Sequence, residues 1–349
     1  MIFRQLFHQE TGTYTYLLAS RKGGEALLID GVLDRADRYM QLLQQLELKL
    51  VKVLDTHVHA DHITAMGELR DRTECVTVMG VQAPIDVVSM RVDDGEMVTI
   101  EGIQLQALYT PGHTIDSYCY RMADRVFTGD TLLIRSTGRT DFQGGDSLAA
   151  HKSIFTKLLT LPGDMLVYPG HDYKGDTVST IAEEKAFNPR LQVASAGEYA
   201  HIMDNLNLAN PKMMDVAVPT NIAMGLGQSD AENPDWALTV GQLMALQESS
   251  EFALVDLREE SERAANGQIP GSVHAPYNRL ENFIGAGGLL HGMAGASAKP
   301  LLYYCAYGER SAMAVQASQR AQGGGLENVS HLVGGIAAWI EAGGPVEKV

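Results

Sequence analysis

Between Thr56 and His62 the sequence reads THVHADH, so that three histidines and one aspartate fall within six consecutive positions. The stretch follows Leu50–Asp55 (LVKVLD), an apolar run typical of a short buried strand. Side chains that directly follow a strand lie at one rim of a sheet, where a loop can turn them toward a common centre. The density of ligand-type residues at such a place predicts a metal site rather than unrelated surface or core histidines.

Three further candidate ligands occupy equivalent positions along the chain. Each follows a strand-like segment and a glycine: His113 in TPGHT after Gln104–Tyr109, Asp130 in FTGDT after Arg125–Thr128, and His171 in YPGH after Met165–Tyr168. The glycines permit tight turns that aim the next side chain. Imidazole together with carboxylate suits zinc, iron or manganese.

Helix-like and strand-like segments alternate through the first two-thirds of the chain. Glu25–Asp30 (EALLID) has the apolar character of a buried strand, and Asp34 is expected to cap a helix after it. A longer helical segment, Leu148–Leu161, separates the strand candidates that precede Asp130 and His171. This alternation predicts a layered α/β domain.

A second, shorter α/β pattern begins after the polar, turn-rich stretch Gly225–Asp235 (GLGQSDAENPD), which we expect to be a linker. Its predicted elements are helix Val240–Gln247, strands Phe252–Leu257 and Leu301–Tyr304, and helix Ser311–Gln322. A length of 349 residues also exceeds what one hydrophobic core usually supports. We therefore predict two domains, residues 1–230 and 231–349.

The charge and composition of the chain limit the binding partners and the cellular compartment that we expect for it. A formal net charge of −16 would repel nucleic acid, so we expect no nucleic-acid partner. We also expect no membrane partner, because no apolar run approaches the roughly 18 residues that cross a bilayer, and the N-terminal stretch lacks the features of a signal peptide. Cys75, Cys119 and Cys305 are too few and too widely spaced for a disulfide framework, which fits a reducing, cytoplasmic compartment. Homo-oligomerisation stays open.

The order of the candidate ligands closely resembles the metallo-β-lactamase superfamily, whose H-x-H-x-D-H motif and later His, Asp and His supply metal ligands. The resemblance covers roughly residues 1–225 and implies an αββα sandwich. Three stretches are similar to the persulfide dioxygenase branch nearly end to end: LLIRSTGRTDFQGGD, LPGDMLVYPGHDYKGDTVSTIAEEKAFNPRL and DNLNLANPKMMDVAVPTN.

That branch implies one Fe(II) per chain, held by the residues that match His57, His113 and Asp130. Two histidines and one carboxylate form a facial triad, which leaves positions for water, substrate and O₂. The remaining members of the cluster, expected to orient the ligands and to exclude a second ion, are His59, Asp61, His62 and His171.

The same resemblance implies glutathione persulfide as the substrate, oxidised with O₂ to sulfite and glutathione. Glutathione carries two carboxylates, so cationic and hydrogen-bonding contacts near the metal are expected; the candidates are Arg139 and Lys174 for charge and Tyr173 for a hydrogen bond. Two plainer interpretations stay open, because Arg139 could form a structural ion pair with Asp141 or Asp146, and Lys174 could be a solvated surface lysine.

Two other functions compete with this hypothesis. The chain keeps every residue that glyoxalase II enzymes use for two metals, so a dinuclear zinc hydrolase of glutathione thioesters is the main alternative. The other is a non-enzymatic sulfur carrier or sensor with a structural metal. A structural zinc site is normally closed by four ligands, often cysteines, and no cysteine lies near the motif.

The second domain resembles a rhodanese in ALVDLREESE, QIPGSVHAP, YYCAYGERS and GGIAAWIEAGGPV. A strand delivers Cys305 to a tight loop, CAYGERS, which leads into a helix. Loop N–H groups and the helix N-terminus would cradle a thiolate or persulfide, and Arg310 would brace the loop. Four residues separate Cys305 from Arg310, as in sulfurtransferases, whereas related cysteine phosphatases have five.

The two predicted activities share an intermediate. A rhodanese can move the outer sulfur of thiosulfate to glutathione through a persulfide on Cys305, which gives sulfite and the glutathione persulfide that the dioxygenase consumes. Fusion would raise the local concentration of that species. The transfer also runs in reverse, from glutathione persulfide and sulfite to thiosulfate, and the sequence leaves the direction open.

Overall fold

The computed structural model describes residues 1–85, 88–206, 208, 211, 213–222, 235–247, 252–297, 299–321, 326 and 328–349. The chain forms two compact units, made up largely of residues 1–224 and 225–349. The expected linker lies outside the described residues except for Asp235, and so does the expected boundary at residue 230, which stays a prediction.

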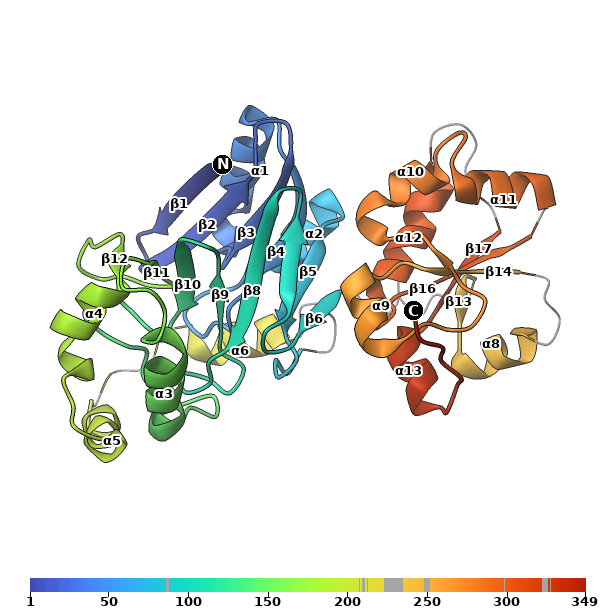
Figure 1. Ribbon diagram of the computed structural model, residues 1–349. Helices are drawn as coiled ribbons and strands as arrows, with labels where there is room; N and C mark the ends of the chain where they lie inside the picture. The colour runs from blue at the N-terminus through green and yellow to red at the C-terminus, as the bar shows by residue number, and fades with distance from the viewer. Residues whose placement is uncertain are drawn as a thin grey trace. The chain divides into compact units, whose positions relative to one another are not determined.

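The first unit contains two six-stranded sheets (Figure 1). The first sheet has the order β1-β2-β3-β4-β5-β6, with strands Ile2–His8, Thr13–Ala19, Glu25–Ile29, Lys49–Leu54, Val76–Gly80 and Met90–Val92. Strands β1 to β3 are antiparallel, whereas β3 to β6 are parallel. The THVHADH stretch therefore leaves β4 at the same sheet edge where the chain leaves β3.

The second sheet delivers the other candidate ligands. Its order is β12-β11-β10-β9-β8-β7, with strands Ser179–Thr180, Leu166–Pro169, Arg125–Gly129, Tyr118–Arg121, Ile103–Tyr109 and Met97–Ile100. Strands β10 and β11 are parallel, and β8 runs the same way because β9 is antiparallel to both β8 and β10. The carboxyl ends of β8, β10 and β11 thus share one edge, from which His113, Asp130 and His171 follow.

Aromatic side chains join the two sheets. The rings of Tyr16 on β2 and Phe127 on β10 have centroids 4.9 Å apart, and those of Phe3 on β1 and Tyr168 on β11 are equally close. Apolar burial between the sheets therefore forms one core layer of the unit.

Helices cover the outer faces of both sheets, which confirms the expected αββα sandwich (Figure 1). Helices α1 (Ala36–Gln45) and α2 (Met66–Thr73) belong to the first sheet, while α3 (Ser147–Ser153), α4 (Ile181–Phe187) and α5 (Ala196–Asp204) belong to the second. A further helix, α6, spans Met214–Ile222. None of the described helices is long and apolar enough to cross a bilayer.

Two sequence-based expectations need correction. Asp34 does not cap α1: it lies in a 3₁₀ turn, Leu33–Arg35, and its carboxylate contacts His8 Nε2 at 3.1 Å. The expected helix at Leu148–Leu161 is α3 followed by a π-helical turn, Ile154–Leu158, because the backbone changes its hydrogen-bond spacing after Ser153.

The second unit is a five-stranded parallel sheet with the order β13-β17-β16-β14-β15. Its strands are Ala237–Leu238, Val329–Leu332, Leu301–Tyr304, Ala253–Asp256 and Val273–His274. Its helices are α8 (Val240–Gln247), α9 (Glu260–Asn266), α10 (Leu280–Ile284), α11 (Leu289–Ser297), α12 (Glu309–Arg320) and α13 (Gly335–Glu341). Trp339, Leu302 and Tyr304 are buried in its core. Strand β16 and helix α8 have the expected bounds, and α12 begins two residues before the predicted Ser311.

Candidate functional site

His57, His113 and Asp130 converge although they come from two sheets. One potential ligand atom from each lies within 4.8 Å of the others, and all three side chains are largely buried. The shared carboxyl edge of β8 and β10 supplies two of them, and the loop after β4 supplies the third. The structure thus brings together the triad that the sequence predicts.

The hydrogen bonds of the two histidines leave the same nitrogen free on each ring. His113 Nδ1 lies 2.7 Å from the carbonyl oxygen of Arg139, which can only accept, so Nδ1 carries the proton. His57 Nδ1 lies 2.9 Å from the Thr56 hydroxyl, whose own proton goes to Asp30 Oδ2 at 3.0 Å. Both Nε2 atoms therefore keep a lone pair for a metal ion, as in other oriented histidine ligands.

Electrostatics support the ligand forms of His57 and Asp130. Burial and the neighbouring His59 hold the pKa of His57 well below its usual range, so its imidazole is neutral. Burial alone would raise the pKa of Asp130, but the charge of His171 outweighs it and lowers the pKa. Asp130 Oδ1 accepts from His171 Nδ1 at 2.6 Å, which leaves Oδ2 on the side of His113.

The other four residues of the cluster surround this triad. Asp61 Oδ2 lies 2.9 Å from both His62 Nδ1 and His171 Nε2. His171 thus contacts a carboxylate through each ring nitrogen, and although burial opposes protonation, these two charges raise its pKa well above the usual range. His59 Nε2 faces Asp30 Oδ1 at 3.2 Å. With both ring nitrogens protonated, His171 has no free lone pair for a metal.

Two buried nitrogens in the cluster have no hydrogen-bond partner within the described part of the chain, His59 Nδ1 and His62 Nε2. With Asp61 these residues form a second group whose candidate ligand atoms lie within 4.8 Å of one another. An unpartnered buried polar atom is costly unless water or an ion satisfies it. The donor chemistry of the whole cluster therefore fits metal binding, and the protein geometry alone accommodates one ion or two.

Asn221 anchors the loop that carries the first ligands, and sequence reasoning did not single it out. Its amide donates to the carbonyl oxygens of His59 and His62, each at 2.9 Å, and its oxygen accepts from Thr64 N at 3.0 Å. Because Asn221 lies on α6, far along the chain, the sequence signal for it was only its place at the end of the DNLNLANPKMMDVAVPTN stretch.

A cavity of about 280 Å³ opens beside the triad. Residues that line it include His57, His113, Asp130, Asp61, His171, Arg139, Tyr173, Lys174, Arg190 and Leu208. Tyr173 is 74% exposed, and Lys174 is exposed as well. The structure therefore places all three expected substrate contacts at the cavity.

Arg139 is engaged in the ion pair that the sequence left open. Its guanidinium donates to both Asp141 oxygens, at 2.6 and 2.7 Å, and lies over the Phe142 ring. Arg190 is the cation that sequence reasoning missed: it donates to the Thr137 carbonyl and has no carboxylate partner among the described residues. Its place in the quoted NPRL sequence was the available signal.

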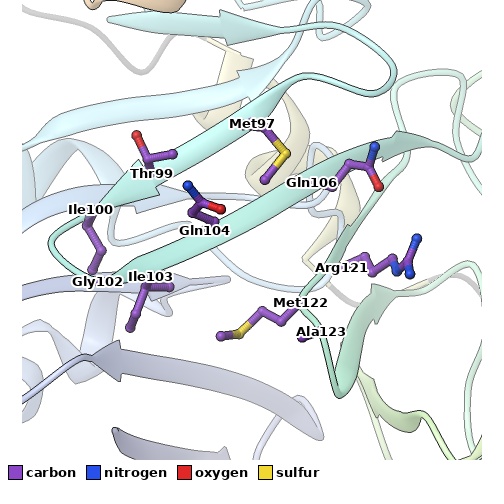
Figure 2. A pocket seen from close by; sticks show the side chains of 10 residues that line it. All are labelled: Met97, Thr99, Ile100, Gly102, Ile103, Gln104, Gln106, Arg121, Met122 and Ala123. Carbon is purple, nitrogen blue, oxygen red and sulfur yellow. The ribbon is translucent and has the colours of Figure 1, made fainter.

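A broader, open cavity of about 670 Å³ lies elsewhere on the second sheet (Figure 2). It covers the face of β7, β8 and β9 on which Met97 pairs with Gln106 and Thr99 with Gln104. None of the candidate metal ligands lines it. We therefore assign the chemistry to the smaller cavity.

In the second unit the loop after β16 encloses Cys305. The thiol is buried, Gly308 N donates to its sulfur at 3.1 Å, and the Ser311 hydroxyl lies 3.7 Å away. Gly335 packs tightly against this loop, since a Cβ there would lie 2.5 Å from the Cys305 carbonyl oxygen. Of the N–H groups expected to surround the sulfur, the structure shows that of Gly308 in contact with it.

Arg310 braces the loop through a buried ion pair that the sequence did not reveal. Its Nη1 and Nη2 donate to the two oxygens of Glu262, at 2.7 and 2.6 Å. Asp256 and Arg258 form a separate buried pair in the scaffold. The remaining cysteines are buried, and burial raises the pKa of Cys119 to about 11.

Comparison with known proteins agrees with both units. Residues 9–83 and 79–171 match the family model of the metallo-beta-lactamase superfamily, and residues 239–342 match that of the rhodanese-like domain. The protein called persulfide dioxygenase ETHE1, mitochondrial, is 43% identical in Homo sapiens and in Mus musculus over 233 residues, which span 65% of this chain and 89% of each relative.

A solved structure extends the similarity. The crystal structure of ETHE1 from Myxococcus xanthus is 52% identical, covers 65% of this chain and 100% of that chain, and has a TM-score of 0.63. The identity and coverage of these relatives place the chain in the ETHE1 family of the metallo-beta-lactamase superfamily, with a rhodanese-like domain in its C-terminal third.

Proposed function

We propose that the first domain oxidises glutathione persulfide with O₂ in an Fe(II)-dependent reaction. Glutathione persulfide, O₂ and water give glutathione, sulfite and two protons. The observation that carries the proposal is the oriented triad, in which His57 Nε2, His113 Nε2 and Asp130 Oδ2 remain available while His171 is held by two carboxylates. The persulfide dioxygenase name of the relatives supports the same chemistry.

One iron per chain would be held by His57, His113 and Asp130. When bound, ferrous iron supplies open positions for sulfur and O₂ and carries the redox chemistry. The protein's part is orientation: the Arg139 carbonyl and the Thr56 hydroxyl fix the two imidazoles. His59, Asp61, His62 and His171 would set the charge around the ligands.

We assign binding of the glutathione carboxylates to the cations that stay accessible at the cavity. Arg190 lines it without a carboxylate partner among the described residues, and Lys174 is exposed at its rim beside Tyr173. The Arg139 guanidinium is already paired with Asp141, so in this proposal it contributes less to carboxylate binding than Arg190 and Lys174.

For the second domain we propose sulfur transfer through Cys305. Its thiolate attacks the outer sulfur of thiosulfate, the S–S bond breaks, and sulfite leaves with the bonding electrons. Glutathione thiolate then attacks the Cys305 persulfide, forming glutathione persulfide and restoring the Cys305 thiolate. The Gly308 N–H stabilises the sulfur anion, while the Glu262–Arg310 pair keeps the loop in place.

A dinuclear zinc hydrolase of glutathione thioesters remains the second candidate function. The unpartnered nitrogens His59 Nδ1 and His62 Nε2 favour it, because a second ion would satisfy both. Metal analysis separates the two hypotheses: one iron per chain supports the dioxygenase, and two zinc ions per chain with thioesterase activity support the hydrolase.

The decisive experiment is O₂ uptake by anaerobically iron-loaded protein on addition of glutathione persulfide, with sulfite assayed in parallel. We expect uptake with matching sulfite, its loss in His113→Ala, and its retention in Cys305→Ser. Absence of uptake together with hydrolysis of S-lactoylglutathione by the zinc-loaded protein would refute the dioxygenase. A cytoplasmic location and any homo-oligomer stay predictions.

A further inference from the structure

A line of hydrogen-bonding side chains leads from the candidate metal cluster toward the protein surface. It begins at Thr13, the first residue of β2, whose buried hydroxyl donates to Asp61 Oδ2 at 3.2 Å and lies 3.1 Å from His171 Nε2. The Thr11 hydroxyl follows at 2.6 Å, and His8 Nδ1 lies 2.7 Å beyond it. No step in this line exceeds ordinary hydrogen-bond length.

The outer end of the line reaches solvent. His8 Nε2 lies 3.0 Å from Glu10 Oε2 and 3.1 Å from Asp34 Oδ2. The His8 side chain is only 5% exposed, whereas those of Glu10 and Asp34 are 67% and 63% exposed. Arg35 is the other charged neighbour, and it pairs with both carboxylates. A buried imidazole thus stands between internal hydroxyls and surface carboxylates.

We propose that Thr13, Thr11 and His8 form a proton relay between the metal centre and the surface. This inference rests on the proposed dioxygenase function, whose reaction releases two protons beside a buried cluster. When a proton reaches the Thr13 oxygen, the Thr13 hydroxyl turns its own proton from Asp61 to the Thr11 oxygen, and the Thr11 proton moves to His8 Nδ1. Each O–H bond that breaks is replaced, a new N–H bond forms on His8, and its Nε2 proton passes to Asp34 or Glu10 and then to water.

The chemistry of the side chains suits this transfer. A hydroxyl both donates and accepts, so the line can reverse its polarity without moving heavy atoms. Imidazole releases one proton as it takes up another and is the usual protein group for shuttling protons near neutral pH. Bound glutathione would fill the cavity and exclude water there, whereas Thr13, Thr11 and His8 do not line the cavity and stay unobstructed.

The test is Thr11→Val, which removes the middle hydroxyl while keeping the side-chain shape. Thr73→Val is the matched control, because Thr73 is also half-buried and, within the described part of the chain, its hydroxyl bonds only to the helix carbonyl of Leu69. In iron-loaded protein at low buffer concentration, we expect kcat for O₂ uptake to fall about tenfold in Thr11→Val with KM unchanged. The kcat of the His8→Ala variant should fall by a similar factor and should recover as free imidazole is added.

A second readout does not depend on turnover. In zinc-loaded protein labelled with ¹⁵N-histidine, the His8 Nδ1 resonance should shift in Thr11→Val but not in Thr73→Val, since only the former breaks its hydrogen bond. Wild-type kcat in Thr11→Val, or a His8→Ala variant that imidazole does not rescue, would overturn the relay while leaving the dioxygenase intact. Absence of persulfide-dependent O₂ uptake in the wild type would overturn both.

Discussion

Replacing Glu262 with glutamine should destabilise the second domain strongly. Glu262 and Arg310 are 9% and 0% exposed, and within the described part of the chain Glu262 accepts both hydrogen bonds of that guanidinium, at 2.6 and 2.7 Å. Glutamine removes the negative charge and leaves the buried guanidinium uncompensated. Breaking a buried pair in this way costs about 3–5 kcal/mol.

Tryptophan fluorescence can follow this loss in the intact chain. The sequence has two tryptophans, Trp236 and Trp339, and both lie in the second unit. With an m-value of about 2 kcal/mol/M for a domain of this size, we expect the urea midpoint to fall by about 1.5–2.5 M in Glu262→Gln. The exposed Glu341 on α13 provides the control, because Glu341→Gln should change stability by less than about 0.5 kcal/mol.

The outcome that would refute this reasoning is a Glu262→Gln destabilisation no larger than that of Glu341→Gln. A double variant, Glu262→Gln with Arg310→Met, checks the cause. Removing the guanidinium should recover part of the lost stability, because no unpaired charge then remains in the interior. Equal instability of the single and double variants would show that packing, rather than charge, accounts for the loss.

The remaining predictions concern pH, metal and substrate. Burial would raise the pKa of Glu262, but Arg310 lowers it. The stabilisation from Glu262 should therefore be complete above the unfolded pKa of about 4.3 and decrease as pH falls below that value, so the difference in urea midpoint between wild type and Glu262→Gln should be smaller at pH 4 than at pH 7. Thr56→Val leaves His57 Nδ1 without its partner and should weaken iron binding about 10–100-fold, measured by chelator competition. Arg190→Met should raise KM for glutathione persulfide at least about tenfold with kcat retained; an unchanged KM would exclude Arg190 from carboxylate binding.

The cluster that forms the candidate metal site could be predicted from sequence because strand topology alone brings its residues together. His113, Asp130 and His171 each follow a strand of the second sheet, and these strands point the same way. The strand bounds at β4, β8, β10, β11 and β16 were close to the predicted segments for the same reason, since buried apolar runs with turn residues at their ends define them.

Features that depend on distant side chains could not be predicted. The Glu262–Arg310 pair joins residues 48 positions apart, and the Asn221 contacts with the ligand loop span about 160. Arg139 and Lys174 looked alike as cations in the sequence, yet Asp141 neutralises one and the other is exposed. The π-helical turn after α3 was not predicted either; its Ile154 and Leu158 are buried in the core of the unit.

Because His113 contacts the backbone carbonyl of Arg139, we expect residues 138 and 139 to differ in the substitutions that they tolerate. A carbonyl belongs to the backbone, so substitution of the Arg139 side chain leaves its oxygen available to His113. Gly138 is different, because a Cβ there would lie 2.2 Å from the Asp130 carbonyl oxygen and 2.8 Å from His113 Nδ1. Any side chain at residue 138 would displace both Asp130 and His113, so a substitution that is tolerated at residue 139 would disrupt the candidate metal site at residue 138.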